Sequence, residues 1–309
     1  MGSIKVTRVS SYRSGAPLNL KLRPQRTIER SVAVDGYGYW SGRDVHVEFR
    51  PAAADTGIVF VRSDLQPQVR IPALHALRIE TPRRTTLATG GATVEMVEHI
   101  MAALAGLAID NCEVWVDRPE MPGCDGSSQA FVDALDSAGV VEQDAPRATL
   151  VVSDVMRVGC DDSWVEARPA PQGGLSVRYR LDYGSQGPIG KQTLQLAVSP
   201  ETFRRELASA RTFLLQEEAD WLRNRGLGCR ASMSDLLVFG PEGPIDNTLR
   251  FPDECVRHKT LDLIGDLAMC GCDIVGQIVA YRSGHRLNAD LVRALLTEGR
   301  RSVSWRRTG

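Results

Sequence analysis

The stretch VEHIMAALAGLAIDNCEVWV, residues 97–116, decides the fold. Apolar residues that recur at helical spacing predict a helix from about Val94 to Leu107, ending near Gly106. The alternating segment Cys112–Val116 then predicts a strand directly after this helix. A helix of this kind, followed closely by a strand, indicates a sheet that packs on helices.

A second stretch, RHKTLDLIGDLAMCGCDIVGQIVAY over residues 257–281, repeats this order. Glu254 to Cys270 is typical of a long buried helix, and Ile274–Tyr281 of the strand that follows it. In both stretches a histidine, His99 or His258, precedes a glycine by seven residues. The correspondence predicts an α+β fold of two similarly folded domains, each a sheet packed on helices, with the active site between them.

Short β-branched or aromatic segments elsewhere predict further strands. These segments are Val45–Phe49, Gly57–Val61, Thr149–Val152, Trp164–Arg168 and Leu175–Leu181. Helices are predicted after Ser127, with Gly139 as the stop, and from Pro200 to Ala208. The polar segment 142–147 marks the best domain boundary. The chain should therefore divide into a flexible leader (1–23), an N-terminal α+β domain (24–147) and a C-terminal α+β domain (148–309).

The bulk composition excludes several classes of protein. A net charge of −1 over 309 residues argues against a nucleic-acid binder, which would carry a basic excess. No apolar run approaches the ~18 residues needed to span a bilayer, and the N-terminus has no apolar signal-peptide core. The seven cysteines contain no Cys-x-x-Cys pair, which favours reduced thiols. We expect a cytoplasmic monomer without stable membrane insertion.

Two short motifs contain residues that can bind a metal ion. In His258-Lys259-Thr260-Leu261-Asp262 an imidazole and a carboxylate are four residues apart, so on a helix they share a face and can grip one ion. This spacing alone also suits a solvated polar face. Glu98-His99 could supply a third ligand and a base. Three protein ligands would leave a position open for water, as in catalytic zinc sites.

These motifs occur together in one known family. The two stretches resemble the UDP-3-O-acyl-N-acetylglucosamine deacetylase family, as do Ser283-Gly284-His285, Pro119-Glu120, Asp125-Gly126-Ser127 and Ala210-Arg211-Thr212-Phe213. The resemblance runs in order from about residue 25 to 295. It implies a zinc-dependent amide hydrolase of lipid A synthesis, which removes the N-acetyl group of a UDP-3-O-acyl-N-acetylglucosamine and releases acetate.

The resemblance also implies the metal ligands and the catalytic residues. The ligands would be His99, His258 and Asp262, a donor set that accommodates zinc or iron(II). Glu98 is similar to the general base that activates the attacking water. His285 resembles the cationic partner that stabilises the oxyanion and protonates the leaving amine. Asp266 would orient His285, and Thr212 would donate a hydrogen bond to the oxyanion.

Four further residues are similar to those that contact the substrate in this family. Lys259 resembles the lysine at the polar head of the substrate, and Phe213 the aromatic residue beside the sugar. Asp182 and Tyr183 stand where the family has Asp-Phe near the uridine, so that Tyr183 would stack on the base. The expected ligand is therefore a UDP-3-O-acyl-N-acetylglucosamine or a related UDP-sugar.

The chain departs from the family pattern near the expected acyl passage and the metal. Trp40 replaces a histidine, Arg230 replaces a glycine, and Arg83-Arg84 follow Thr81-Pro82 where the family has small or apolar residues. Buried guanidinium groups would alter an apolar passage, whereas exposed ones would leave it intact. Two alternatives stay open, namely the same chemistry on a shorter-acyl or unacylated UDP-sugar, and a catalytically idle nucleotide-sugar-binding protein. The presence of all six expected metal-binding and catalytic residues weighs against the idle protein, namely Glu98, His99, His258, Asp262, Asp266 and His285.

Overall fold

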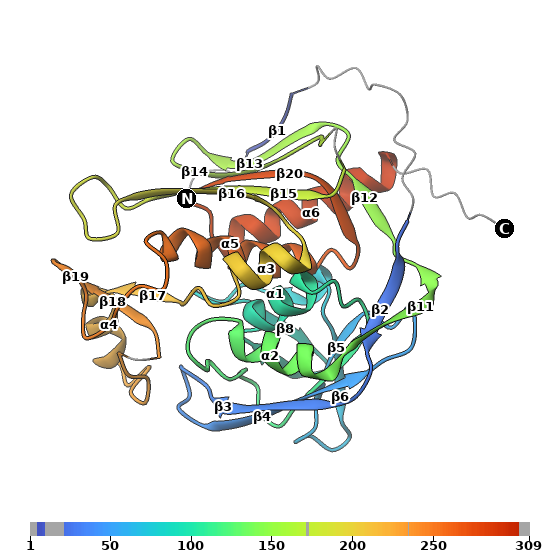
Figure 1. Ribbon diagram of the computed structural model, residues 1–309, viewed down its shortest axis with the longest axis horizontal. Coiled ribbons are helices and arrows are strands. Elements are labelled where there is room, and N and C mark those ends of the chain that lie inside the picture. The colour runs from blue at the N-terminus through green and yellow to red at the C-terminus, as the bar shows by residue number, and fades with distance from the viewer. Residues whose placement is uncertain (1–4, 10–21, 171–172, 234, 303–309) are drawn as a thin grey trace.

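Two β-sheets enclose a layer of helices (Figure 1). The structure is a computed structural model that describes residues 5–9, 22–170, 173–233 and 235–302. Helices α1 (Glu98–Gly106) and α5 (Glu254–Ala268) pack against each other in the middle of the layer. Helix α2 (Gln129–Ala138) contacts α1 and the first sheet, and α6 (His285–Ser302) contacts α5 and the second.

The first sheet has five strands in the order β3-β4-β10-β5-β6. Their bounds are β3 Val32–Tyr37, β4 Asp44–Pro51, β10 Cys112–Val116, β5 Ile58–Arg62 and β6 Val69–Pro72. β10 runs antiparallel to β4 and parallel to β5. Every second residue of β4 and β10, including Val47, Phe49 and Val114, is buried against the helices.

The second sheet has seven strands, of which five follow the order β13-β14-β20-β15-β16. Their bounds are β13 Val155–Cys160, β14 Ser163–Arg168, β20 Asp273–Tyr281, β15 Leu175–Asp182 and β16 Lys191–Ala197. β20 runs antiparallel to β14 and parallel to β15. Two further strands, β1 (Lys5–Val9) and β12 (Thr149–Val151), pair with β13 and β20.

The two sheets share one topology, which confirms the prediction of two similarly folded units. In each, four strands come first in the chain, a helix follows, and the fifth strand then enters the centre of the sheet before a second helix. Helix α1, β10 and α2 of the first unit thus correspond to α5, β20 and α6 of the second. The seven-residue spacing from histidine to glycine lies on the equivalent helices α1 and α5.

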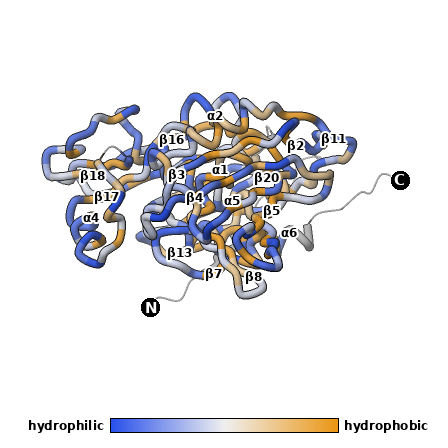
Figure 2. Tube along the Cα trace, turned by 90° about the horizontal axis from the view of Figure 1, so that it is seen from below, coloured by the Kyte–Doolittle hydropathy of each residue, from blue (hydrophilic) through white to orange (hydrophobic). Residues whose placement is uncertain are grey.

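Each unit carries an insertion at the same point, between its fourth strand and its first long helix. The first insertion comprises η1 (His75–Leu77), β7 (Arg78–Ile79), β8 (Thr86–Thr89) and β9 (Ala92–Glu95). The second comprises α3 (Pro200–Glu206), β17 (Phe213–Leu215), α4 (Gln216–Arg223), β18 (Leu237–Gly240) and β19 (Gly243–Pro244). Strands β17 and β18 with α4 form a lobe at one side of the molecule (Figure 2).

A glycine allows the two central helices to approach closely. A Cβ atom at Gly265 of α5 would lie 2.1 Å from the carbonyl oxygen of Glu98 and 3.2 Å from the backbone nitrogen of Ala102. Glycine in the middle of a helix costs about 1 kcal/mol relative to alanine, and here it permits backbone contact between α1 and α5. The first turn of α1 is thereby placed directly beside α5.

The structure corrects two details of the sequence prediction. The predicted helix start at Val94 is wrong, because Ala92–Glu95 forms β9 and α1 begins at Glu98. Val94 lies in a strand, where alternate residues face the core, and is buried there. Its helical spacing to the apolar residues that follow is therefore a coincidence. Within the expected leader, Lys5–Val9 forms β1, while residues 1–4 and 10–21 lie outside the described part. The boundary near residue 147 stays a prediction, between the end of β11 (Val140–Pro146), which pairs with β2 (Pro24–Ile28), and the start of β12.

Candidate metal centre and active site

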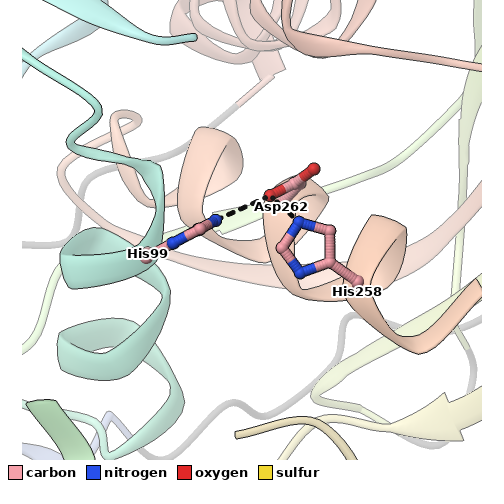
Figure 3. Close-up of side chains that lie close together, drawn as sticks. All are labelled: His99, His258 and Asp262. Atoms are coloured by element: carbon pink, nitrogen blue, oxygen red, sulfur yellow. Dashed lines mark ion pairs between the residues drawn. The ribbon is translucent and has the colours of Figure 1, made fainter. Parts of the chain in front are cut away.

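Three potential metal ligands meet where α1 packs on α5 (Figure 3). His99 comes from the first turn of α1, and His258 and Asp262 lie one turn apart on α5. Nε2 of His99 is 3.6 Å from Oδ1 of Asp262, and Nε2 of His258 is 3.5 Å from the same oxygen. All three residues are buried, and their donor atoms lie within 4.8 Å of one another. One ion could therefore bind all three side chains.

Asp262 has one carboxylate oxygen without a hydrogen-bond partner. Oδ1 is buried and unpaired, whereas Oδ2 accepts a hydrogen bond of 2.7 Å from Nζ of Lys259. Burial opposes ionisation, but His258 and Lys259 outweigh it and hold the pKa of Asp262 well below its usual range. A buried acceptor without a partner costs about 1–3 kcal/mol, and more when it is charged. A cation between this oxygen and the two imidazoles would remove that cost, so the residues fit a metal ion.

The imidazole of His258 has its Nε2 directed at the centre of the cluster. Nδ1 lies 3.1 Å from the carbonyl oxygen of Ala210, to which it can donate, and this leaves the Nε2 lone pair free. Burial lowers the pKa of His258 to about 4, so the ring is neutral at pH 7. Neutral imidazole with a carboxylate is a donor set that zinc and iron(II) accept. The Thr212 hydroxyl lies 3.1 Å from the same Nε2 and donates to the carbonyl oxygen of Gly126 over 3.0 Å.

A second group of titratable residues lies beside the first. Oε1 of Glu98 is 3.8 Å from Nε2 of His285, the first residue of α6, and Nδ1 of His285 is 2.9 Å from Oδ2 of Asp266. Burial disfavours the imidazolium, but the Asp266 and Glu98 carboxylates outweigh it and raise the pKa of His285 to about 9. Burial also raises the pKa of Glu98, against the opposing effect of His285 and His99. At pH 7 the His285 imidazolium therefore faces Glu98, a carboxyl group whose raised pKa makes it a stronger base.

Two residues that the sequence did not single out complete the surroundings of Asp266. Thr85 donates from Oγ1 to Oδ1 of Asp266 over 2.7 Å, and its backbone nitrogen donates to Oε2 of Glu98 over 3.0 Å. Asn288 donates from Nδ2 to Oδ2 of Asp266 over 2.8 Å. The spacing of three residues between His285 and Asn288 at the start of a helix could have indicated a shared face. Nothing in the sequence around Thr85 indicated its contacts.

A buried ion pair supports the segment that carries Thr212. Nε of Arg211 is 2.8 Å from Oε1 of Glu254, and both side chains are buried. Glu254 also accepts from the backbone nitrogen of Arg211, over 3.1 Å, and from that of Arg250, over 2.6 Å. The first residue of α5 thus fixes the backbone directly before Thr212.

The cluster opens into a cavity of about 1110 Å³. All but one of the predicted site residues line it, and Asp266 lies behind His285. The rings of Tyr183 and Phe213 stand edge to face in the wall, with centroids 5.8 Å apart. Asp182 lines the cavity, but its carboxylate accepts hydrogen bonds from Tyr281 and Gly184 and lies 3.2 Å from Nζ of Lys191.

The arginines that were expected near the acyl passage bind acidic partners. Arg230 is exposed, and its Nη1 lies 2.6 Å from Oδ1 of Asp44, with the guanidinium over the ring of Tyr37. Arg83, at the cavity rim, pairs with Glu218 over 3.0 Å. Arg230 and Arg83 thus reach solvent, as one of the two alternatives expects, whereas the Arg84 side chain is only 20% exposed and lies against Trp40. An intact acyl passage stays a prediction.

Comparison with known sequences matches this architecture to one family. The sequence model of UDP-3-O-acyl N-acetylglycosamine deacetylase matches residues 25–297. The UDP-3-O-acyl-N-acetylglucosamine deacetylases of Brucella ovis, Brucella melitensis biotype 2 and Brucella suis biovar 1 are each 42% identical over 278 residues. The match covers 89% of this chain and 96% of each relative. The chain belongs to the UDP-3-O-acyl-N-acetylglucosamine deacetylase family.

This member of the deacetylase family has an indole in the cavity wall where a histidine was expected. Trp40 lines the cavity, its backbone nitrogen donates to Glu120 over 2.7 Å, and the Arg84 guanidinium lies 4.7 Å from its ring centroid. Arg84 is itself paired with Glu95 over 2.8 Å. An indole cannot exchange a proton at neutral pH, so Trp40 contributes packing to the deacetylase cavity and no acid or base.

Within the described residues no helix is both long and apolar enough to cross a membrane.

Proposed function

We propose that this chain is a metal-dependent deacetylase that hydrolyses the N-acetyl group of a UDP-3-O-acyl-N-acetylglucosamine and releases acetate, in lipid A synthesis. One observation carries the proposal. In a chain of this family, a buried and unpaired carboxylate oxygen of Asp262 faces two imidazole nitrogens in the wall of a large cavity. The names of the matched relatives give the reaction and its substrate.

The metal would be held by His99, His258 and Asp262. We propose zinc, and iron(II) suits the same donors. When bound, such an ion polarises a carbonyl oxygen and lowers the pKa of a water molecule. The described residues hold no fourth protein ligand within the cluster, which leaves room for water and substrate.

Glu98 and His285 provide the base and the acid that amide hydrolysis requires. Burial raises the pKa of Glu98, which makes its carboxylate a better acceptor for a proton of the attacking water. Asp266 keeps His285 protonated, so Nε2–H can stabilise the negative charge that develops on the carbonyl oxygen. The same proton can then pass to the leaving amine. The Thr212 hydroxyl has one donor hydrogen, so it would turn from the carbonyl oxygen of Gly126 to donate a second hydrogen bond to the carbonyl oxygen of the substrate.

The walls of the cavity favour an acylated UDP-sugar over an unacylated one. The side formed by the second insertion is apolar, with Leu214, Leu222, Leu236 and Val238. The cationic side chains of Lys259, Arg282 and Arg286 also line the cavity and suit a diphosphate. An apolar wall of this kind stabilises each buried methylene of an acyl chain by about 0.8 kcal/mol. We assign Tyr183 to the uracil, Phe213 to the sugar and Asp182 to the neighbourhood of the uridine.

Metal analysis with an acetate-release assay tests the proposal. The parent protein should hold about one divalent ion per chain and release acetate from acylated UDP-N-acetylglucosamine faster than from the unacylated sugar. Glu98→Gln should keep the ion and lose roughly 10²–10⁴ in kcat, the usual worth of general acid–base catalysis. His46→Ala changes an exposed histidine paired with Asp35 and is the control. A metal-loaded parent that releases no acetate from any UDP-sugar would favour the idle nucleotide-sugar-binding protein.

The compartment and assembly are part of the proposal. All seven cysteines are free thiols, which suits the reducing cytoplasm. We expect a monomer, which sedimentation of the purified protein would test.

A further inference from the structure

Thr85 contacts the proposed base, Glu98, and also Asp266, the carboxylate that binds the proposed acid, His285. It is fully buried in the first insertion, directly before β8. Its backbone nitrogen donates to Glu98 over 3.0 Å, its hydroxyl donates to Asp266 over 2.7 Å, and its carbonyl oxygen accepts from the backbone nitrogen of Val97. One residue therefore holds the first turn of α1 and the middle of α5 at once.

Among the described residues, the Thr85 hydroxyl is the one hydrogen-bond donor to Oδ1 of Asp266. Oδ2 of Asp266 accepts from Asn288 and faces Nδ1 of His285, while Oδ1 accepts from Thr85. Asp266 is fully buried, so water has no direct access to Oδ1. Without the threonine hydroxyl this oxygen would be an unpaired buried acceptor, and the carboxylate would turn toward other donors.

We propose that Thr85 is a positioning residue that fixes the proposed base, Glu98, relative to the proposed acid, His285. It acts on Glu98 directly through its amide and on His285 through Asp266. The proposal rests on the proposed function, and it assigns Thr85 no contact with substrate or metal. A displacement of about 1 Å in a reacting group can cost 100-fold in rate, so the loss of one anchoring bond should affect kcat more than KM.

The neighbouring threonine provides a matched control. Thr86 is also buried, at 1% exposure, and its hydroxyl has no hydrogen-bond partner within the described residues. Thr85→Val and Thr86→Val thus make the same change of shape at adjacent buried positions. Only the first of them removes a hydrogen bond to the proposed active site.

The experiment compares kcat, KM, metal content and thermal unfolding for the parent, Thr85→Val, Thr85→Ser and Thr86→Val. Thr85→Val should lose roughly 10- to 100-fold in kcat, with KM within about twofold and metal content unchanged. Thr85→Ser keeps the hydroxyl and should recover most of kcat, and Thr86→Val should match the parent. A kcat for Thr85→Val equal to that of Thr86→Val would overturn the proposal. So would a serine variant no better than the valine variant, or a change confined to KM.

The same set of variants distinguishes a loss of folding from a loss of catalysis. If Thr85→Val does not fold, Thr85→Ala removes the hydroxyl without adding a methyl group and takes its place. Unfolding of both, with a folded and active Thr85→Ser, would show that the hydroxyl serves the fold alone and would overturn the proposal. A parent without deacetylase activity would overturn the proposed function and this proposal together. An active parent with an insensitive Thr85 would overturn this proposal only.

Discussion

Two charged clusters join the halves of the molecule, one at each end of the packed helices α1 and α5. The first is the candidate metal centre near the start of α1, where Asp262 has a buried oxygen without a partner. The second lies beyond the C-terminal ends of both helices, where Asp110 and Asp273 face Arg23 and Arg147. The two clusters differ in whether every carboxylate oxygen accepts a hydrogen bond from a protein donor.

In the second cluster every carboxylate oxygen has a donor. Arg23 binds Asp110 through Nη1 and Nη2 over 2.7 and 2.8 Å, and Asp273 through Nε and Nη2, both over 2.8 Å. Nε of Arg147 lies 2.9 Å from Asp110 and 3.3 Å from Asp273. Each domain-sized half contributes one aspartate near the start of its central strand, β10 or β20.

The contrast distinguishes a site that could bind a ligand from a contact that holds the structure together. Fully paired carboxylates need nothing further, so the arginine cluster stabilises the junction of the two halves. A buried carboxylate oxygen with no donor carries a desolvation cost that an incoming cation could offset. The comparison therefore predicts that substitutions in the first cluster abolish metal binding and activity, while those in the second change stability.

The largest effect is expected for Asp262→Ala, which removes the unpaired oxygen. Metal affinity should fall by at least about 100-fold, since even groups that only orient a ligand contribute 10–100-fold. Acetate release should fall with it. Metal content after dialysis against a chelator, measured beside the parent, checks this. Stoichiometric metal in the variant would remove the distinction between the clusters.

Next is the pH dependence set by Asp266. The pKa of His285 is raised to about 9 against an ordinary value of 6.5, so the stability from its partners is full below pH 6.5 and is lost as the pH rises to 9. The protonated form of His285, the proposed acid, declines as the pH rises through about 9. Asp266→Asn should lower kcat and move the basic limb of the profile to lower pH. A limb that stays near pH 9 in this variant would contradict the assignment of the acid.

Asp110→Asn tests the second cluster. Loss of a charged partner for Arg23 and Arg147 should lower the free energy of unfolding by about 2–3 kcal/mol. The kcat should stay within about twofold of the parent, because the cluster lies beyond the far ends of the helices. Urea unfolding and acetate release measure the two quantities. A fall in kcat as large as that of Asp262→Ala would mean that both clusters serve the reaction.

The smallest effect is expected for Arg230→Gly, at an exposed contact between the halves. An exposed ion pair such as Arg230–Asp44 contributes about 0–1 kcal/mol. With the apolar wall intact, affinity should rise by about fourfold per methylene in an acyl series, and the variant should follow the same line. A parent with a flat chain-length dependence that the glycine variant restores would show that Arg230 obstructs the passage.

The sequence predicted those parts of the molecule that follow from local periodicity or from short spacing. The strand Cys112–Val116 and the helix after Glu254 are confirmed, because alternation and helical spacing specify them locally. His258 and Asp262 share a helix, so their proximity was predictable from spacing alone. The structure also brings His99 to them from the other half of the chain.

Contacts made through the insertions could not be predicted in the same way. Thr85 reaches Asp266 across 181 positions of the sequence, and a buried threonine carries no pattern that names its partner. Arg23 and Arg147 lie in segments without a recognisable motif, and their ion pairs with Asp110 form only when the two halves pack together. The effect of Arg230 was open because a guanidinium can lie in a cavity or reach solvent with the same sequence.

The contact at Gly265 fixes the spacing of the two backbones that carry the ligands. Backbone meets backbone there, so no side chain can change rotamer to widen or narrow the gap between α1 and α5. The distance between the backbone of His99 and the backbones of His258 and Asp262 is accordingly fixed. Ions of different radius could be bound only if the side chains of the three ligands moved, because the packed helices cannot change their separation. Selectivity by ionic size would then depend on how far the ligand side chains can move over a fixed backbone spacing.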